Sequence, residues 1–188
     1  FIAPQPSFKD GEVERVGSIL IDAEQRWVMA TGFVNQVEGP IELLACGVGG
    51  KRHESIFVLE CNPLDLQTGF LLLGARSGEP MPALGMGPPQ GSELTIWVEW
   101  QADGKRVLRK AEECIYNAEK RGVLERITWI FSGSLFEHGQ FKAVAEESLV
   151  ATYWDPWAII NIGNEVGAND ENLFIEGHNL PPLHTPIV

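Results

Sequence analysis

Basic residues, cysteines and long apolar runs are scarce in this sequence. Of its 188 residues, 14 are Lys or Arg and 26 are Asp or Glu, which gives a formal net charge of −12 at pH 7. Nucleic acids bind proteins through basic surfaces that displace counterions, so we expect no nucleic-acid partner. A membrane-spanning helix needs a run of about 18 or more apolar residues, and the sequence contains none. It therefore predicts a globular domain without a membrane span in this chain.

The cysteines are too few for a disulfide scaffold. They are Cys46, Cys61 and Cys114, so at least one has no partner within the chain. Iron–sulfur clusters are held by sets of closely spaced cysteine thiolates, which this sequence does not offer. The spacing argues against an iron–sulfur cofactor, and the residues indicate no particular cofactor in its place.

The length suits one domain, because two hydrophobic cores would be crowded in a chain of this size. The chain does not begin with Met, and its first residues, FIAPQPSFKDGE, are polar and contain Pro4 and Pro6. Such a first segment is typical of a mature protein whose signal segment has been removed, and also of a trimmed chain. We interpret residues 1–17 as a leader and residues 18–188 as a single domain.

Short segments of β-branched and aromatic residues, separated by turns, dominate the sequence. SILID and RWVMATGFV near the start are examples. The clearest hairpin is ELTIWVEWQADGKRVLRK, in which Asp103 and Gly104 suit a tight turn. Alternation places Ile96, Val98 and Trp100 on one face of that hairpin. Many short strands of this kind favour a mainly antiparallel sheet.

The strongest helix signal covers residues 63–74. Asn62 can cap the first turn, Pro63 fits the first helical position, and leucines recur at helical spacing. A short helical or irregular segment is expected at about 111–121, and a short turn of helix at DPWAII. The predicted fold class is therefore α+β, with a predominantly antiparallel sheet, one main helix and one or two short helices.

The stretch ELLACGVGGKRHESIFVLEC, residues 42–61, gathers several reactive side chains around a glycine-rich bend. We predict that residues 40–46 and 55–61 pair as an antiparallel hairpin, which puts Cys46 beside the bend. Cys61 would then lie roughly 20 Å away, because each strand residue advances about 3.3 Å. A disulfide needs Cα atoms within about 7 Å of each other, so none is expected between these two cysteines.

Cys46 is expected next to Lys51, Arg52, His53 and Glu54, and three interpretations of this group stay open. In the first, Cys46 is a nucleophile, His53 is its base and Glu54 orients the ring. In the second, Cys46 and His53 are ligands of a copper or zinc ion. In the third, Cys46 is a small buried apolar residue, and the polar residues only cap and solvate a turn.

The same residues form part of a longer pattern. EGPIELLACGVGGKRHES is followed by an apolar helix ending in LGA and later by WIFSGS. From about residue 18 onward, the chain resembles the YdjY-like domain family of bacterial proteins. The matching positions are Glu38, Gly39, Pro40, Glu42, Ala45, Cys46, Gly49, Lys51, His53, Glu54, Ser55, Leu73, Gly74, Ala75, Trp129, Phe131, Gly133 and Ser134. His184 stands where the family pattern has Gly, so no special backbone role is carried over to that position.

The resemblance implies an exported bacterial protein whose activity is not established by its family. An extracytoplasmic location is expected, either in the periplasm or at a membrane through a removed N-terminal segment, as in lipoprotein-like members. Some members are described as ferredoxin-like, but the cysteine spacing argues against a cluster here. The expected partners are a small molecule or another exported protein.

The leading hypothesis is a domain that binds a small ligand or a metal ion at the loop between Cys46 and Ser55. The candidate ligand-binding residues are Cys46, Lys51, His53, Glu54, Ser55, Trp129 and Ser134, and the candidate metal ligands are Cys46 and His53. One alternative is a thiol-based or hydrolytic enzyme with Cys46, His53 and Glu54 as catalytic residues. The other is a structural or interaction module.

Overall fold

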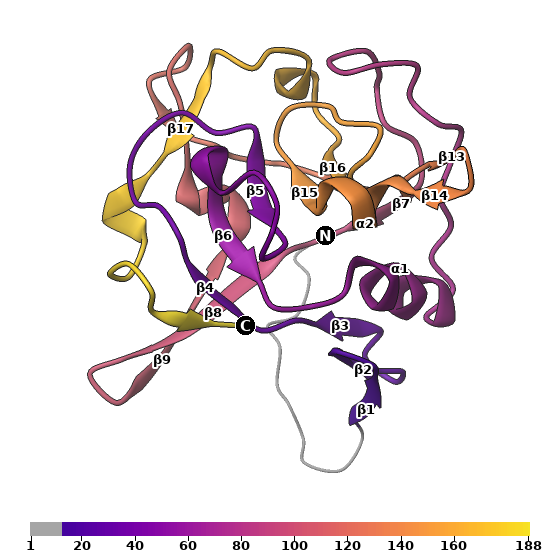
Figure 1. Ribbon diagram of the computed structural model, residues 1–188. Coiled ribbons are helices and arrows are strands. Elements are labelled where there is room, and N and C mark those ends of the chain that lie inside the picture. The colour runs from indigo at the N-terminus through magenta and orange to yellow at the C-terminus, as the bar shows by residue number, and fades with distance from the viewer. Residues whose placement is uncertain (1–12) are drawn as a thin grey trace.

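Strands are the main regular secondary structure in the computed structural model, which describes residues 13–188 (Figure 1). The strands are β1 (Val13–Val16), β2 (Ile19–Asp22), β3 (Trp27–Met29), β4 (Gly32–Val34), β5 (Leu43–Cys46), β6 (Ser55–Leu59), β7 (Ser92–Leu94), β8 (Trp97–Ala102), β9 (Lys105–Lys110), β10 (Ile115–Asn117), β11 (Gly122–Val123), β12 (Trp129–Phe131), β13 (Phe136–Glu137), β14 (Gln140–Phe141), β15 (Ser148–Ala151), β16 (Ile160–Ile162), β17 (Leu173–Ile175) and β18 (Pro186–Ile187). The helices are α1 (Pro63–Leu72) and α2 (Lys142–Glu146), with short 3-10 turns η1 (Arg52–Glu54), η2 (Ala111–Cys114), η3 (Glu165–Ala168) and η4 (Gly177–Asn179). This content confirms the α+β fold class. Within residues 13–188, no helix is long and apolar enough to cross a membrane.

An eight-stranded sheet in the order β18–β4–β6–β5–β15–β16–β12–β7 forms the centre of the molecule. Its neighbouring strands are antiparallel except for the pairs β5–β6 and β15–β16, which are parallel. Smaller sheets, β1–β2–β3 and β11–β10–β17, and the ribbons β8–β9 and β13–β14 pack around it. Residues 13–16 of the predicted leader form β1 and pair with β2. The rest of the leader, residues 1–12, lies outside the described residues.

The predicted antiparallel hairpin of residues 40–46 and 55–61 is wrong. Strands β5 and β6 are parallel neighbours, with Leu43 beside Ser55 and Cys46 beside Val58. The physical reason is that nearly every residue of both strands is buried, and strands covered on both faces show no alternation that could indicate their direction. The parallel direction brings Cys46 and Cys61 toward the same end of the strand pair, so the distance argument against a disulfide does not hold. All three cysteines are nevertheless buried free thiols.

Helix α1 begins where the sequence predicts. Asn62 Oδ1 accepts a 2.9 Å hydrogen bond from the Leu64 N–H, and Pro63 is the first helical residue. The helix ends at Leu72, slightly before the predicted end, because Gly74 adopts a left-handed φ of +81°.

The buried face of α1 is not the one that the leucine spacing suggests. Leu66 and Gly69 are buried, whereas Leu64, Leu71 and Leu72 are exposed. The segment predicted as helical or irregular, 111–121, begins with η2 and continues into β10. DPWAII forms a turn without a helix, and the second α-helix, α2, lies where none was predicted. Tertiary contacts therefore override weak local helix signals in these segments.

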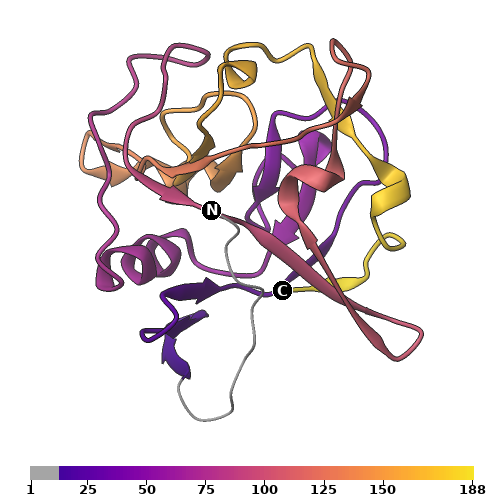
Figure 2. The same cartoon turned by 180° about the vertical axis from the view of Figure 1, so that it is seen from behind.

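The β8–β9 hairpin has the predicted turn. Ala102 pairs with Lys105, and the turn residues Asp103 and Gly104 have φ values of +51° and +70°, as a type I′ turn requires. Val98 and Trp100 are both buried, as their alternation predicts. Figure 2 shows this hairpin running diagonally along the back of the molecule, and its Glu99 exchanges two backbone hydrogen bonds with Val188 next to β18.

The buried hydrophobic residues form two clusters, and strands of the eight-stranded sheet contribute to both. The larger contains Leu44, Ala45, Ile56, Phe57, Val150 and Ile160, among others, and the smaller consists of Leu43, Cys46, Val58, Ala151 and Ala158. Because side chains alternate along a strand, Ala45 and Cys46 point to opposite faces. The loop 47–54 covers the smaller cluster, since a Cβ atom on Gly50 would lie 3.0 Å from the Cys46 Cβ.

Candidate functional site

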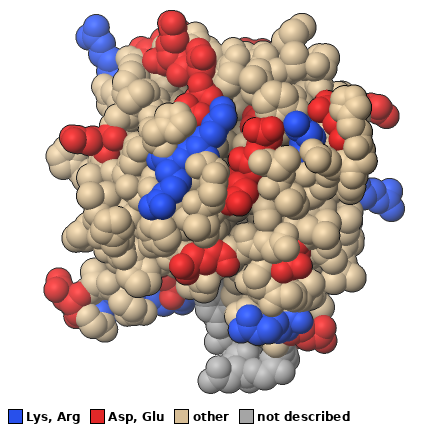
Figure 3. Space-filling view, in the orientation of Figure 1, with Lys and Arg blue, Asp and Glu red and all other residues tan. Residues whose placement is uncertain are grey.

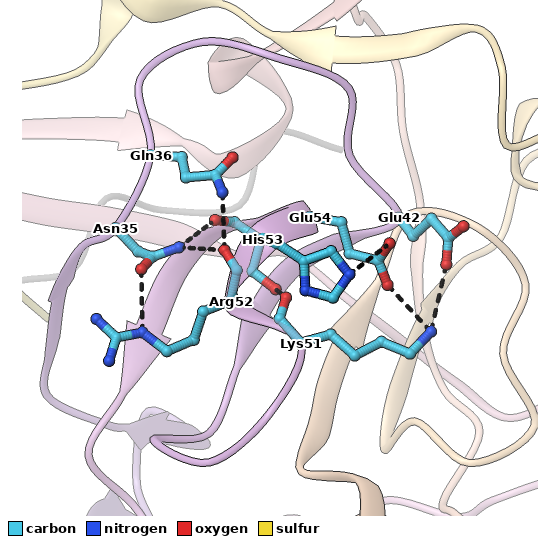
Figure 4. Close-up of polar contacts among 8 residues, drawn as sticks. Asn35, Gln36, Glu42, Lys51, Arg52, His53 and Glu54 are labelled. Atoms are coloured by element: carbon cyan, nitrogen blue, oxygen red, sulfur yellow. Dashed lines mark hydrogen bonds and ion pairs between the residues drawn. The ribbon is translucent and has the colours of Figure 1, made fainter.

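The connecting loop, residues 47–54, joins β5 to β6 and is fixed by side-chain amides from outside it (Figure 4). Asn35 Nδ2 donates hydrogen bonds to the carbonyl oxygens of Arg52 and Ser55, at 2.6 and 2.8 Å. Gln36 Nε2 donates a third, of 2.9 Å, to the same Arg52 carbonyl. The backbone around η1 is therefore held in one position, and its side chains start from a rigid base.

Lys51 lies between two carboxylates at the surface. Its Nζ is 3.0 Å from Glu54 Oε1 and 3.4 Å from Glu42 Oε2. Figure 4 shows the lysine side chain extending along the loop to a point between the two acids, and Figure 3 shows acidic and basic side chains side by side on this face. We call Glu42, Lys51, His53 and Glu54 the charged cluster.

Two carboxylates share one ammonium group in this cluster, and the pKa of Glu42 is raised mainly by its burial. Burial and the nearby Glu54 carboxylate raise the pKa of Glu42, while Lys51 lowers it less. Burial lowers the pKa of Lys51, but the Glu54 and Glu42 carboxylates outweigh it and the net shift is upward. Lys51 is therefore fully protonated at neutral pH, and the cluster retains a capacity for further positive charge.

His53 points into solvent. Its side chain is 80% exposed, and its Nε2 lies 3.7 Å from Glu54 Oε2. Figure 4 shows the ring beside Glu54 at the edge of the cluster. His53 is thus available to a ligand that approaches from solution.

Cys46 occupies a different environment, in the hydrophobic interior. Its side chain is fully buried in the smaller cluster with Val58 and Ala151. Burial raises the pKa of the Cys46 thiol, against smaller lowering effects of the Ser55 hydroxyl and the Arg52 charge. The thiol is therefore neutral near pH 7, and the structure separates it from the solvent-exposed His53 ring.

The remaining predicted residues fall into structural positions. Ser55 is buried, and its hydroxyl donates a 2.7 Å hydrogen bond to the Lys51 carbonyl, which closes the η1 turn. Ser134 Oγ donates to the carbonyl of Trp157. Trp129 is fully buried in β12, and its indole N–H donates to Glu112 at 3.5 Å. The structure thus groups Lys51, His53 and Glu54 at the surface and places Cys46, Ser55, Trp129 and Ser134 elsewhere.

Three acidic residues that the sequence analysis did not select contribute to this region. Glu42 completes the charged cluster. Glu147 contacts the glycine part of the loop, with its Oε2 accepting a 2.6 Å hydrogen bond from the Gly49 N–H and its carbonyl accepting one from Gly47. Asp155 is 4% exposed and its Oδ1 accepts a 2.8 Å hydrogen bond from the Trp157 N–H. Of the three, only Glu42 had a sequence signal, as part of the EGPIE pattern.

The geometry offers no ready metal site. Among residues 13–188, no three His, Cys, Asp or Glu side chains are placed to hold a metal ion together. Cys46 and His53, the candidate ligands from the sequence, lie in the interior and in solvent respectively. A cation could reach Glu42, Glu54 and His53 only if the Lys51 ammonium group moved away from between the acids.

The comparisons with known proteins agree with the pattern of residues around the loop. The family model described as the YdjY domain matches residues 19–188, which is nearly the whole chain. No curated protein and no solved structure matches it. The match includes β5, the connecting loop, α1 and the WIFSGS segment, from which the resemblance was inferred. The chain therefore belongs to the YdjY domain family.

Proposed function

We propose that this chain is the binding domain of an exported bacterial protein and that it takes a small cationic ligand at the charged cluster. The observation that carries the proposal is the arrangement of Lys51 between Glu42 and Glu54, with His53 beside them. These side chains are partly or largely exposed, and the backbone beneath them is fixed by Asn35 and Gln36. A rigid, partly solvated polar group is suited to ligand recognition.

The charge of the cluster determines the class of ligand. Glu42 and Glu54 carry two negative charges against the single charge of Lys51, and the Glu54 carboxylate adds to burial in raising the pKa of Glu42. An amine or a divalent metal ion would contact both acids by taking the place of the Lys51 ammonium group, which moves aside on binding. The exposed His53 would supply an additional nitrogen ligand to a metal ion.

Binding is better supported than thiol catalysis. A thiol nucleophile needs solvent access and a lowered pKa, whereas Cys46 is fully buried and its pKa is raised. The enzymatic alternative with Cys46, His53 and Glu54 would require a rearrangement that exposes the sulfur to His53.

Calorimetric titration tests the proposal with two kinds of probe, zinc or copper ions and a small diamine. The wild-type chain is compared with His53→Ala, Glu54→Gln and Cys46→Ala. We expect Glu54→Gln to weaken binding of either probe by about tenfold or more, as loss of a buried or partly buried charge contact does. His53→Ala should weaken only metal binding, and Cys46→Ala should leave both unchanged. Equal heats for the wild type and Glu54→Gln would contradict the proposal.

A second candidate function is structural, and a specific observation favours it. Asn35, Gln36, Ser55 and Glu147 each make a hydrogen bond to the backbone of the loop. If the loop only braces the sheet, Asn35→Ala should lower the melting temperature, while Glu54→Gln should change no titration heat. His53→Ala serves as the control for stability, because its exposed ring contributes little to folding.

The extracytoplasmic location belongs to the same proposal. It is supported by the family to which the chain belongs, whose members are expected to be exported. Fractionation of bacterial cells that produce the natural full-length protein tests it. Recovery of the protein in the cytoplasmic fraction alone would contradict it.

A further inference from the structure

A cavity of about 450 Å³ is lined by residues of the eight-stranded sheet and by no residue of the connecting loop. We call the part lined by six apolar residues of its central strands the floor, and these residues are Leu44, Ala45, Phe57, Leu59, Val150 and Ile160. Ala45 and Phe57 point toward the cavity, and their strand neighbours Cys46 and Val58 belong to the cluster on the other face. The cavity is therefore separate from the charged cluster and goes beyond the proposed function.

The walls of the cavity come from elements far apart in the sequence. Strand β3 contributes Trp27, helix α1 contributes Phe70, and the connection between β7 and β8 contributes Ile96 and Trp97. In Figure 1, β3 and α1 lie at the lower right, and in Figure 2, the view from behind, the β8–β9 hairpin runs diagonally across the front. The sheet floor, the helix and the two strands together enclose the space on several sides.

The chemistry of the lining changes from the floor to the rim. All six floor residues are apolar, and Leu44, Ala45 and Phe57 are less than 4% exposed. Among the polar lining residues, Gln25 and Arg26 come from the β2–β3 turn and Thr95 from the β7–β8 connection, whereas Glu93 lies in β7 and Glu99 in β8. Of the charged ones, Glu99 is already paired with Arg106 at 2.6 Å. A charged group would find no hydrogen-bond or ion-pair partner on this floor. A hydrocarbon group would displace water from it, which is favourable.

The size of the cavity also points to an occupant. Protein interiors are normally packed as tightly as organic crystals, and voids larger than a water molecule are few. Pockets that bind small organic molecules have volumes of roughly 300–1,000 Å³ and mainly apolar walls with a few polar groups. We propose that this cavity binds the alkyl chain of a medium-length amphipathic molecule, with its polar head at the rim near Arg26. The ligand class is thus set by an apolar floor and a polar rim.

Decanol and decanoate are suitable probes, because they share the chain and differ in the head group. Binding is measured by calorimetry at several temperatures and by the fluorescence of the tryptophans at the rim. We expect both probes to bind the full chain with a negative heat-capacity change, which is the signature of burying apolar surface. We also expect them to raise its melting temperature. Absence of binding by both probes overturns the proposal.

Two substitutions that fill the cavity locate the site. Ala45→Leu adds volume to the floor, and Ala30→Leu adds it at the half-buried wall, where the chain tolerates change more easily. Each should weaken decanol binding by about tenfold or more, because the larger side chain fills space that the alkyl chain of decanol would occupy. Ala118→Leu, at an exposed position outside the cavity, is the matched control and should bind like the wild type. If Ala30→Leu and Ala45→Leu fold, as judged by circular dichroism, and bind decanol as the wild type does, the cavity is not the site.

The two binding proposals can fail independently. Glu54→Gln changes the charged cluster on one face of the sheet and should leave decanol binding unchanged. Ala45→Leu changes the other face and should leave the titration with metal ions or diamine unchanged. Loss of decanol binding in Glu54→Gln would overturn the assignment of the alkyl chain to the cavity.

Discussion

The Gly49 N–H donates a 2.6 Å hydrogen bond to Glu147 Oε2 and so joins two segments that are 98 residues apart in the sequence. Glu147 follows α2 and has a left-handed φ of +50°, which is unusual for a residue with a side chain. The Gly47 N–H donates to the carbonyl of the same residue. The loop that carries the charged cluster is therefore fastened to the start of β15 through one glutamate.

Replacing Glu147 should loosen this attachment. We expect Glu147→Ala to lower the free energy of unfolding by about 1–2 kcal/mol, because a hydrogen bond to a charged acceptor is lost. Urea denaturation measures the change. Glu147→Gly loses the same bond but relieves the left-handed backbone by about 1 kcal/mol, so it should be the less destabilised of the two. A glycine variant less stable than the alanine variant would contradict this account.

Cys46 should react slowly in the folded protein. Because burial raises the pKa of its thiol and excludes solvent, we expect alkylation near pH 7.5 to be about tenfold slower or more than in the denatured chain. Burial also raises the pKa values of Cys61 and Cys114 to about 12, so these thiols serve as internal references. Mass spectrometry after timed labelling gives the rate at each cysteine. A folded Cys46 that reacts much faster than the other two would favour the enzymatic alternative.

Asp155 should make stability depend on pH. Burial raises the pKa of this carboxyl group, although the hydrogen bond from the Trp157 N–H opposes the shift. A raised folded-state pKa means that its contribution is fully present below the unfolded value of about 3.9 and is lost as pH rises through the folded value. Asp155→Asn keeps an acceptor oxygen for Trp157 and has no charge to bury.

The stability of Asp155→Asn relative to the wild type should therefore increase between about pH 4 and pH 7. Denaturation experiments at several pH values across this range measure the difference. Asp170→Asn, at an exposed position, is the control and should show no such trend. A relative stability that falls toward neutral pH would show that the ionised Asp155 stabilises the fold.

Asn62 should contribute to stability through its cap. Asn62→Ala removes the 2.9 Å hydrogen bond to the Leu64 N–H and should lower the free energy of unfolding by about 1 kcal/mol. Asn62→Asp retains an acceptor and should remain close to the wild type. Thermal or urea denaturation distinguishes the two variants, and equal losses for both would mean that the side-chain cap is not the cause.

The features that the sequence predicts correctly depend on neighbouring residues. The start of α1 follows from Asn62 and Pro63, and the β8–β9 turn follows from Asp103 and Gly104. In each case the preferred backbone angles and the local hydrogen bonds are properties of a few consecutive residues. The abundance of strands and the family to which the chain belongs are also present in the sequence pattern.

The direction of β5 relative to β6 and the separation of Cys46 from His53 depend on the tertiary structure. Both strands are buried on two faces, so their residues carry no signal of direction, and only packing against β4 and β15 selects the parallel pair. That pairing sends the loop over the smaller cluster, buries Cys46 and leaves His53 in solvent. It also brings Glu42 to Lys51 and Glu147 to Gly49. No local sequence pattern predicts these contacts, because packing between residues distant in the sequence fixes them.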